Sequence, residues 1–508
     1  MRAAAVLATG ADRTLETPGE VAGGVVTLVL LVALVVSALW VGLVVVPRDR
    51  RPSSALAWML LIYLLPLAGL LAFALIGSPK LPVSRRDRQR EMDRRIEARV
   101  EREGRAHDPT PGPAWLDGVV RQNTRVGRLP MLRGNAATLH GDYDAAILAM
   151  ADDIASAREH VHVEFYILSL DDTTEPFFAA LEQAVANGAD VRVLFDHIGS
   201  AGYPGYRATR ERLTRAGVRW ALMLPVQPWR GRYQRPDLRN HRKLVVVDGA
   251  VGWAGSQNLI DRSYDKPANV RRGLQWQDLM VRLRGPAVQA LDAVFVTDWY
   301  SETDELLGVR APLRPRDARG AASEGPVAVQ VLPSGPGFET DNNLLMFDAL
   351  LFAARTRVSI TSPYFVPDES LLAAVVAAAL RGCDVELFVP ARADQALVHH
   401  AQRSYYEELL RAGVRIFLYP APYVLHAKHV SIDDDVAVIG SSDLDIRSFA
   451  LDLESSLLCH DRAFVDALRE VEDSYRARSR ELTLAEWVHR PRHQRVLDNL
   501  ARLTSAVQ

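Results

Sequence analysis

An internal repeat is the feature of this sequence that most constrains how the chain can fold. A β-rich run, a helical stretch, a second β-rich run, the pentapeptide RAGVR and a histidine motif occur twice in the same order. The matching segments are 161–169, 188–196, 215–219 and 241–258 in the first half, and 357–368, 382–390, 411–415 and 426–443 in the second. One pentapeptide recurs easily by chance, but an ordered recurrence of this length indicates duplication.

Each half alternates β-rich runs with helices, which predicts an α/β fold with a largely buried, mixed central sheet. Segments 176–187 and 371–380 have the apolar periodicity of such helices. A chain of 508 residues also exceeds what one hydrophobic core usually organises. We therefore expect two α/β domains, at 126–310 and 326–480. The Pro-, Gly- and charge-rich stretch 311–325 is expected to link them.

Two uncharged apolar runs precede the repeat, at about 21–46 and 55–77. Each is long enough to cross a bilayer as a helix, which needs roughly 20 residues, so residues 1–80 are expected to form a membrane anchor with two transmembrane helices. A cleaved signal peptide is the alternative for the first run. It is disfavoured because Asp12 and Glu16 precede the run instead of a basic cluster.

Positively charged residues near the two runs predict the orientation of the anchor. The loop between the runs holds three arginines, whereas Lys80 and six arginines follow the second run within residues 80–95. The excess after residue 80 places the catalytic region in the cytoplasm. Residues 81–125 are expected to form a charged linker that contains an exposed helix. Residues 481–508 are expected to form a helical tail, which either packs on the second domain or lies at the bilayer surface.

Composition excludes some classes of protein. The net charge is only -2, and no basic stripe with interleaved aromatic residues runs along the repeat, which disfavours nucleic acid as a partner. The two cysteines, Cys383 and Cys459, form no disulfide framework and are expected to be buried thiols.

The pattern His-x-Lys-x4-Asp closes the repeat in both halves. In HRKLVVVDG the β-branched residues predict a strand, on which His241 and Lys243 point to the same side. Asp248 has the opposite parity and lies at an Asp-Gly turn, so it is expected to be a strut or supporting group. The second copy repeats this arrangement. The six candidate catalytic residues are His241, Lys243, Asp248, His426, Lys428 and Asp433.

Two such motifs suit the transfer of a phosphodiester group. One imidazole attacks phosphorus, the other protonates the departing alcohol, and the two lysines neutralise the phosphate. Small polar clusters at 255–258 and 440–443 end the returning strands and bring hydroxyl and N–H groups near an anion. Neither a metal nor a cofactor is expected, because histidine and cysteine do not cluster with the spacing of metal ligands.

The paired motifs resemble those of the phospholipase D superfamily, and the wider pattern resembles its bacterial cardiolipin synthases. The resemblance runs from about residue 24 to the C-terminus. It rests on the twin apolar runs, NHRKLVVVDG, SPYFVPDE, the stretch DIRSF at 445–449 and the tail EWVHRPRHQRVLDNLARL.

The resemblance implies that one phosphatidylglycerol donates its phosphatidyl group to a histidine, glycerol leaves, and a second phosphatidylglycerol accepts the group to give cardiolipin. It implies that the protein is integral to the membrane, with these phospholipids as partners. By analogy His241 is the nucleophile and His426 the acid and then the base, although spacing cannot rank the two. The residues expected to help bind phosphate are Ser256, Asn258 and Ser441, and those expected to orient the histidines are Asp278 and Glu454.

One position departs from the resemblance, because residue 443 is Asp where the family usually carries Asn. Several alternatives share the motifs: a phospholipase D that uses water, a phosphatidyltransferase with another acceptor, and a membrane-tethered nuclease. The absence of a basic stripe disfavours the nuclease. A non-enzymatic scaffold is disfavoured because both motifs are complete.

Overall fold

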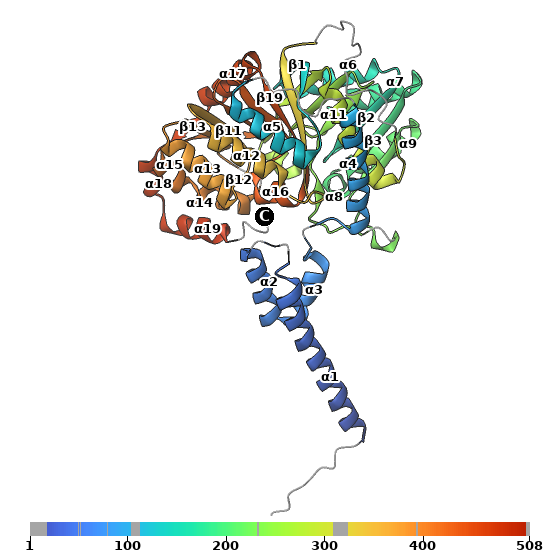
Figure 1. The fold of residues 1–508 in the computed structure, drawn as a ribbon, viewed down its shortest axis with the longest axis vertical. Helices are drawn as coiled ribbons and strands as arrows, with labels where there is room; N and C mark the ends of the chain where they lie inside the picture. Colours follow the sequence, from blue (N-terminus) through green and yellow to red (C-terminus); the bar gives the residue numbers. More distant parts are fainter. Residues whose placement is uncertain are drawn as a thin grey trace, which may run out of the picture. The chain divides into compact units, whose positions relative to one another are not determined.

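The computed structural model describes residues 18–48, 50, 52–78, 80–102, 112–230, 233–307, 324–392 and 395–503 (Figure 1). They form two compact units, and the division falls after Ser78. The linker expected at 311–325 lies almost entirely outside the described residues.

The first unit is helical. Helix α1 (Pro18–Trp40) continues into a short π-helix, η1 (Val41–Val45). Within this stretch, Gly23–Val45 is the one helix among the described residues that is long and apolar enough to cross a membrane. Its position agrees with the first of the two predicted spans.

The second apolar run is divided into two helices, α2 (Pro52–Leu64) and α3 (Pro66–Ile76). Leu65 leaves the helical region with φ -134° and ψ 71°, because the residue before a proline is disfavoured in the helical conformation. Trp58 of α2 packs edge-on against Phe73 of α3, with ring centroids 5.3 Å apart. The single helix expected over 55–77 is therefore corrected to two short helices that contact each other.

The second unit is built around one mixed sheet of 16 strands. The first half supplies β1 (Leu132–His140), β2 (His160–Phe165), β3 (Asp190–Asp196), β4 (Arg219–Met223), β6 (Leu244–Val247), β7 (Val251–Gly255) and β9 (Met280–Arg284). The second half supplies β10 (Val327–Ser334), β11 (Arg357–Thr361), β13 (Asp384–Pro390), β14 (Arg415–Tyr419), β16 (His429–Ile432), β17 (Val436–Gly440) and β19 (Asp452–His460), with β20 (Arg480–Leu482) beside β14. The sixteenth strand is β5 (Arg239–Asn240) of the first half, which pairs with β19.

Strand order confirms the duplication. The first half runs β4-β3-β2-β6-β7-β9-β1 and the second runs β14-β13-β11-β16-β17-β19-β10. Strands β2, β3 and β4 are parallel, whereas β6, β7 and β9 alternate in direction. Antiparallel pairing of β1 with β10 joins the two halves edge to edge. The sheet is therefore continuous across the repeat, and the prediction of a mixed α/β sheet is confirmed.

Helices cover both faces of this sheet (Figure 1). In β6, Leu244 and Val246 pack in the core beneath α11 (Ala287–Thr303), whereas Val245 and Val247 pack in the core beneath α6 (Tyr143–Ala155). A strand that is buried on both faces needs apolar residues without alternation, which explains the run LVVV that follows the first motif.

The segment predicted as a charged linker, 81–125, folds onto the second unit as α4 (Val83–Arg102) and α5 (Ala114–Gly127). Arg85 of α4 forms a buried ion pair with Glu302, next to the end of α11. Helix α5 packs against α12 (Asn342–Ala353) of the second half. Both helices of this densely charged segment therefore have a buried face, and the prediction of an exposed linker is corrected.

The C-terminal tail forms α18 (Leu484–Val488) and α19 (Arg492–Arg502). Helix α19 packs on α14 (Ala396–Ser404), and buried Asp498 accepts a hydrogen bond from His400 at 2.8 Å. The tail is therefore packed on the second half, while Leu497 and Leu500 remain exposed.

Candidate active site

The first histidine motif is attached to the second half of the chain. Its leading strand β5 (Arg239–Asn240) pairs with β19, and the N–H of His241 donates to the carbonyl of Leu453 at 2.8 Å. The buried carboxylate of Asp196 accepts from Arg239 Nη1 at 3.0 Å and from the N–H of Asn240 at 2.9 Å. These contacts fix the backbone on which His241 stands.

The second motif is attached to the first half in the same way. Its leading strand β15 (Tyr423–Leu425) pairs with β8 (Gln275–Gln277), and the N–H of His426 donates to the carbonyl of Gln277 at 2.7 Å. Each motif therefore crosses to the opposite half of the repeat, which brings the two motifs to one place.

The catalytic side chains stand just before the strands, which corrects one detail of the sequence prediction. Strands β6 and β16 begin only after the lysines. Each lysine folds back on its own motif: Lys243 Nζ donates to the carbonyl of His241 at 2.5 Å, and Lys428 Nζ donates to that of His426 at 2.9 Å. Lys428 Nζ also lies 3.1 Å from His426 Nε2.

Each histidine contacts a carboxylate from the opposite half. His241 Nδ1 lies 2.9 Å from Glu454 Oε1, and His426 Nδ1 lies 2.6 Å from Asp278 Oδ1. Both carboxylates are buried, at 0% exposed for Glu454 and 2% for Asp278. A carboxylate on Nδ1 fixes the ring and directs the lone pair or proton of Nε2 away from the carboxylate.

The two candidate serines contact these same carboxylates. Ser256 Oγ donates to Asp278 Oδ1 at 2.7 Å, and Ser441 Oγ donates to Glu454 Oε2. In return, each hydroxyl accepts a backbone N–H at 3.0 Å, from Leu279 and Ser455 respectively. The hydroxyl protons are thus directed to the carboxylates, which leaves none for a phosphate oxygen in this arrangement.

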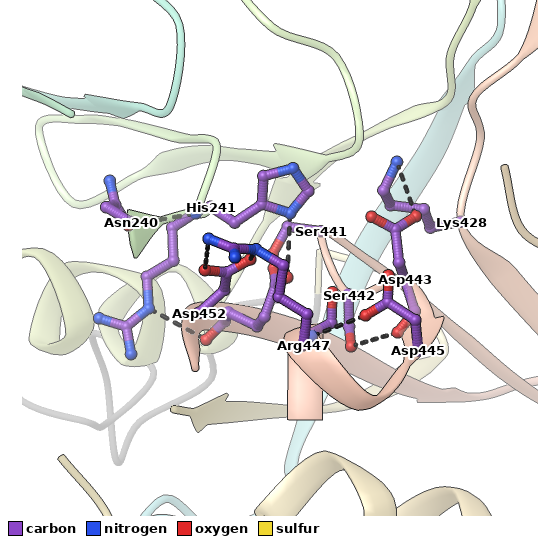
Figure 2. A network of polar contacts seen from close by, with 12 residues as sticks. Asn240, His241, Lys428, Ser441, Ser442, Asp443, Asp445, Arg447 and Asp452 are labelled. Atoms are coloured by element: carbon purple, nitrogen blue, oxygen red, sulfur yellow. Dashed lines mark hydrogen bonds and ion pairs between the residues drawn. The ribbon is translucent and has the colours of Figure 1, made fainter. Parts of the chain in front are cut away.

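The residues two positions after these serines, Asn258 and Asp443, differ between the halves. Asn258 Nδ2 donates to Tyr264 Oη at 2.9 Å, and Asn258 Oδ1 accepts the N–H of Ile167 at 3.2 Å. In the second half, Asp443 Oδ1 lies 3.3 Å from Lys428 Nζ. Figure 2 shows this ion pair near the imidazole of His241.

The motif aspartates lie at the opposite ends of β6 and β16 from the histidines. Asp248 accepts three consecutive backbone N–H groups, at 158–160, over 2.7 to 2.8 Å. Asp433 does the same at 355–357, over 2.8 to 3.1 Å. These contacts anchor the starts of β2 and β11, in accord with a strut, and they place both aspartates outside the catalytic group.

Replacing Asp248 by alanine is expected to lower the free energy of unfolding by about 2–3 kcal/mol, because it removes the charged acceptor of three backbone donors. Thermal unfolding of the detergent-solubilised protein measures this change, with exposed Asp434→Ala as the control. Turnover per folded molecule is expected to stay within a few-fold of the parent protein. A loss of turnover without loss of stability would give Asp248 a chemical role instead.

Comparisons with known proteins agree with this geometry. The family described as "Cardiolipin synthase, PLD-like domain" matches residues 150–299 and 348–474, more than half of the chain. Cardiolipin synthase A of Pectobacterium atrosepticum is 33% identical over 460 residues, which cover 89% of this chain and 92% of that protein. The chain belongs to the cardiolipin synthase family. Both predictions, of the family and of the phospholipase D-type enzyme class, are confirmed.

Further relatives of this cardiolipin synthase family member extend the likeness. Cardiolipin synthase A of Proteus mirabilis is 33% identical over 465 residues, covering 89% of this chain and 92% of that protein. The crystal structure of phosphatidylserine synthase from Haemophilus influenzae superimposes with a TM-score of 0.57 at 16% identity, over 77% of this chain and 100% of that chain. At that identity the superposition shows a shared fold.

The electrostatic environment differs between the two histidines of this cardiolipin synthase family member. Burial and the neighbouring charge of Lys243 lower the pKa of His241 well below its ordinary value. Burial also raises the pKa of its partner Glu454. Burial acts to raise the pKa of Asp278 as well, but attraction to His426 and the hydrogen bond between them hold that pKa below its ordinary value.

Lys243 is expected to set an alkaline limit on activity. Burial lowers its pKa to about 7, although the charge of Glu454 acts in the opposite direction. Because only the ammonium form neutralises a phosphate, kcat/KM should fall as pH rises through about 7. A pH profile of kcat/KM measures this. Lys243→Arg keeps its charge, so its alkaline limb should move to higher pH; an unmoved limb would assign the titration to another group.

Two tyrosines near the histidines were not predicted from the sequence. The ring of Tyr166 lies 5.1 Å from that of His241, nearly perpendicular to it, and Lys243 Nζ lies 5.5 Å from the same ring. The ring of Tyr264 stands 6.3 Å from that of His426. Tyr166 immediately follows β2. Its position at the end of a strand in the repeat is the sequence feature that could have indicated a residue of the site.

A separate group of metal-ligand type lies between β2 and α11. His160, His162 and Asp292 bring ligand atoms within 4.8 Å of one another, and Asp292 Oδ1 lies 2.6 Å from His162 Nδ1. The ring of His162 stacks on Phe295 at 4.3 Å. The backbone of His160 contacts Asp248 of the first motif. The expectation of a metal-free catalytic site stays a prediction.

Proposed function

We propose that the protein is a cardiolipin synthase that moves a phosphatidyl group from one phosphatidylglycerol to another through a phosphohistidine. The observation that carries the proposal is the crossed pair of histidines, each held on Nδ1 by a buried carboxylate of the opposite half. This arrangement supplies two oriented Nε2 atoms and two lysines at one place, which is what a two-step phosphodiester transfer needs.

In the first step, Nε2 of His241 attacks the phosphorus of the donor. A P–N bond forms as the P–O bond to the glyceryl head group breaks, and the proton on His426 Nε2 goes to the departing glycerol oxygen. The lowered pKa of His241 supports its role as the nucleophile, because a neutral imidazole has a free lone pair. The carboxylate of Asp278, 2.6 Å from Nδ1 of His426, supports the acid role because it orients the ring.

In the second step, the now neutral His426 takes the proton of a primary hydroxyl on a second phosphatidylglycerol. That oxygen attacks phosphorus, the P–N bond breaks, and cardiolipin leaves with His241 restored. Lys243 and Lys428 hold the phosphate oxygens in both steps. We propose that Ser256 and Ser441 position Asp278 and Glu454, because their hydroxyl protons point to those carboxylates. Phosphate contact by Asn258 would require release of Tyr264.

We also propose that the first unit anchors the enzyme in the cell membrane, with the catalytic region in the cytoplasm. Helix Gly23–Val45 supports one span. A second complete span at 55–77 would require α2 and α3 to straighten at Leu65. The basic residues after the second run support the orientation. Protease treatment of inside-out and right-side-out vesicles tests it, and cleavage of the catalytic region only from outside would reverse the assignment.

Labelled phosphatidylglycerol, incubated with the purified full-length protein in vesicles, tests the activity. Cardiolipin and glycerol in equal amounts are the expected products. Phosphatidic acid alone would make the protein a phospholipase D, and transfer only to an added alcohol would make it a different phosphatidyltransferase.

A further inference from the structure

At one position near the active site, a neutral residue in the first half of the repeat corresponds to an acidic residue in the second half. The segments that follow β7 and β17 align without gaps as GSQNLIDRSY (255–264) and GSSDLDIRSF (440–449). Asn258 of the first half therefore corresponds to Asp443 of the second, and Tyr264 corresponds to Phe449. These two differences between the halves concern the members of one contact, because Asn258 Nδ2 donates to the hydroxyl of Tyr264 at 2.9 Å.

The second half loses both members of that contact. Phe449 has no hydroxyl, and its ring is buried beside Phe347 at a centroid distance of 6.3 Å. Asp443 is only 4% exposed, and among the described residues its Oδ1 receives no hydrogen bond. The partner of this oxygen is the ammonium of Lys428, at 3.3 Å. A buried carboxylate oxygen without a hydrogen bond is costly, so this oxygen is suited to a ligand that supplies a donor.

The position of Asp443 indicates which part of the substrate supplies that donor. Lys428 Nζ lies 3.3 Å from Asp443 Oδ1 and 3.1 Å from His426 Nε2, so one ammonium bridges the two groups. His426 is the imidazole proposed to exchange a proton with the alcohol. Lys428 thus links Asp443 to the histidine that we assign to the alcohol, and Figure 2 shows Asp443 beside this lysine.

A carboxylate beside Lys428 disfavours a contact between Asp443 and phosphate. A carboxylate can only accept hydrogen bonds, and beside Lys428 it weakens attraction for an anion. The neighbouring Asp445 adds no further negative charge at neutral pH, because burial and the charge of Asp443 raise its pKa to about 8. A neutral hydroxyl group is therefore the ligand that suits this place.

We propose that Asp443 binds a hydroxyl of the glyceryl head group, next to the hydroxyl that leaves or attacks, and so selects polyols over simple alcohols. The proposal rests on the phosphatidyl transfer proposed above. The glyceryl group carries hydroxyls beyond the reacting one, and a hydrogen bond to a charged acceptor is among the stronger ones in proteins.

Competition between two labelled alcohols tests this selectivity. The full-length protein in phosphatidylglycerol vesicles receives labelled glycerol or labelled 1-propanol, which has the same carbon chain and one hydroxyl. Incorporation into phosphatidylglycerol or phosphatidylpropanol gives the ratio of the two transfer rates. In Asp443→Asn this ratio should fall about tenfold, because the hydroxyl then meets a neutral amide in place of a charged acceptor. Exposed Asp434→Asn is the control and should leave the ratio unchanged.

A second variant keeps the test decisive if Asp443→Asn loses all transfer. Asp443→Ser also removes the carboxylate acceptor, with a shorter side chain, so it should lower the same ratio. An unchanged ratio in whichever of these variants still transfers would overturn the inference while leaving the proposed function intact. If the parent protein forms neither cardiolipin nor an alcohol exchange product, the proposed function fails and the inference fails with it.

Discussion

Replacing His241 by alanine is expected to lower phosphatidyl transfer by about 10⁴-fold or more, because loss of a nucleophile removes the covalent pathway. The same change should abolish the phosphohistidine, whose acid-labile P–N bond survives a quench at alkaline pH, so that mass spectrometry of the active-site peptide can detect it. His426→Ala should lower transfer by about 10²- to 10⁴-fold, the usual contribution of a general acid and base.

The location of the phosphoryl group separates the two histidines, which neither spacing nor symmetry can do. With labelled phosphatidylglycerol, the label should appear on the peptide that contains His241. Label on the peptide of His426 would reverse the two roles and leave the two-histidine chemistry in place. Exposed His489→Ala is the matched control and should transfer at the rate of the parent protein. Full activity in either motif variant would rule out the mechanism.

The duplication made most of the fold predictable. Two copies of the same ordered elements predict two similar sheets, and the observed strand orders repeat over seven strands each. What the pattern does not contain is the pairing of β1 with β10, because edge pairing depends on surfaces that form only after each half folds. The break at Leu65 is hidden in the apolar composition, which is continuous across it. The signal for the break is Pro66, because proline restricts the residue before it.

The residues of the site were predictable, but their partners were not. The spacing identifies His241 and His426, and the resemblance supplies Asp278 and Glu454. Which carboxylate contacts which histidine depends on β5 and β15, two- and three-residue strands that cross between the halves. Such short strands carry no periodicity that a sequence can reveal. Hydroxyls suit anions, so the sequence predicts that the serines contact phosphate, whereas burial next to the carboxylates gives them other acceptors.

The crossed contacts make a further result testable: a change in one half should disable the histidine of the other half. Glu454→Gln should lower transfer on the order of 10³-fold through His241, because an amide that donates to Nδ1 moves the imidazole proton to Nε2 and blocks the attacking lone pair. Asp278→Asn should cause a loss of similar size through His426, which can then no longer be stabilised as the charged acid.

A donor with a p-nitrophenyl leaving group distinguishes these two losses. Nitrophenolate departs without a proton, so release from this donor needs the nucleophile but not the acid. Asp278→Asn and His426→Ala should therefore retain a burst of nitrophenol close to that of the parent protein, whereas Glu454→Gln and His241→Ala should lose it. Exposed Asp466→Asn serves as the control carboxylate. If instead Asp278→Asn lost the burst and Glu454→Gln kept it, while His241→Ala still lost it, the carboxylates would serve the histidines of their own halves, and the crossed geometry would be wrong.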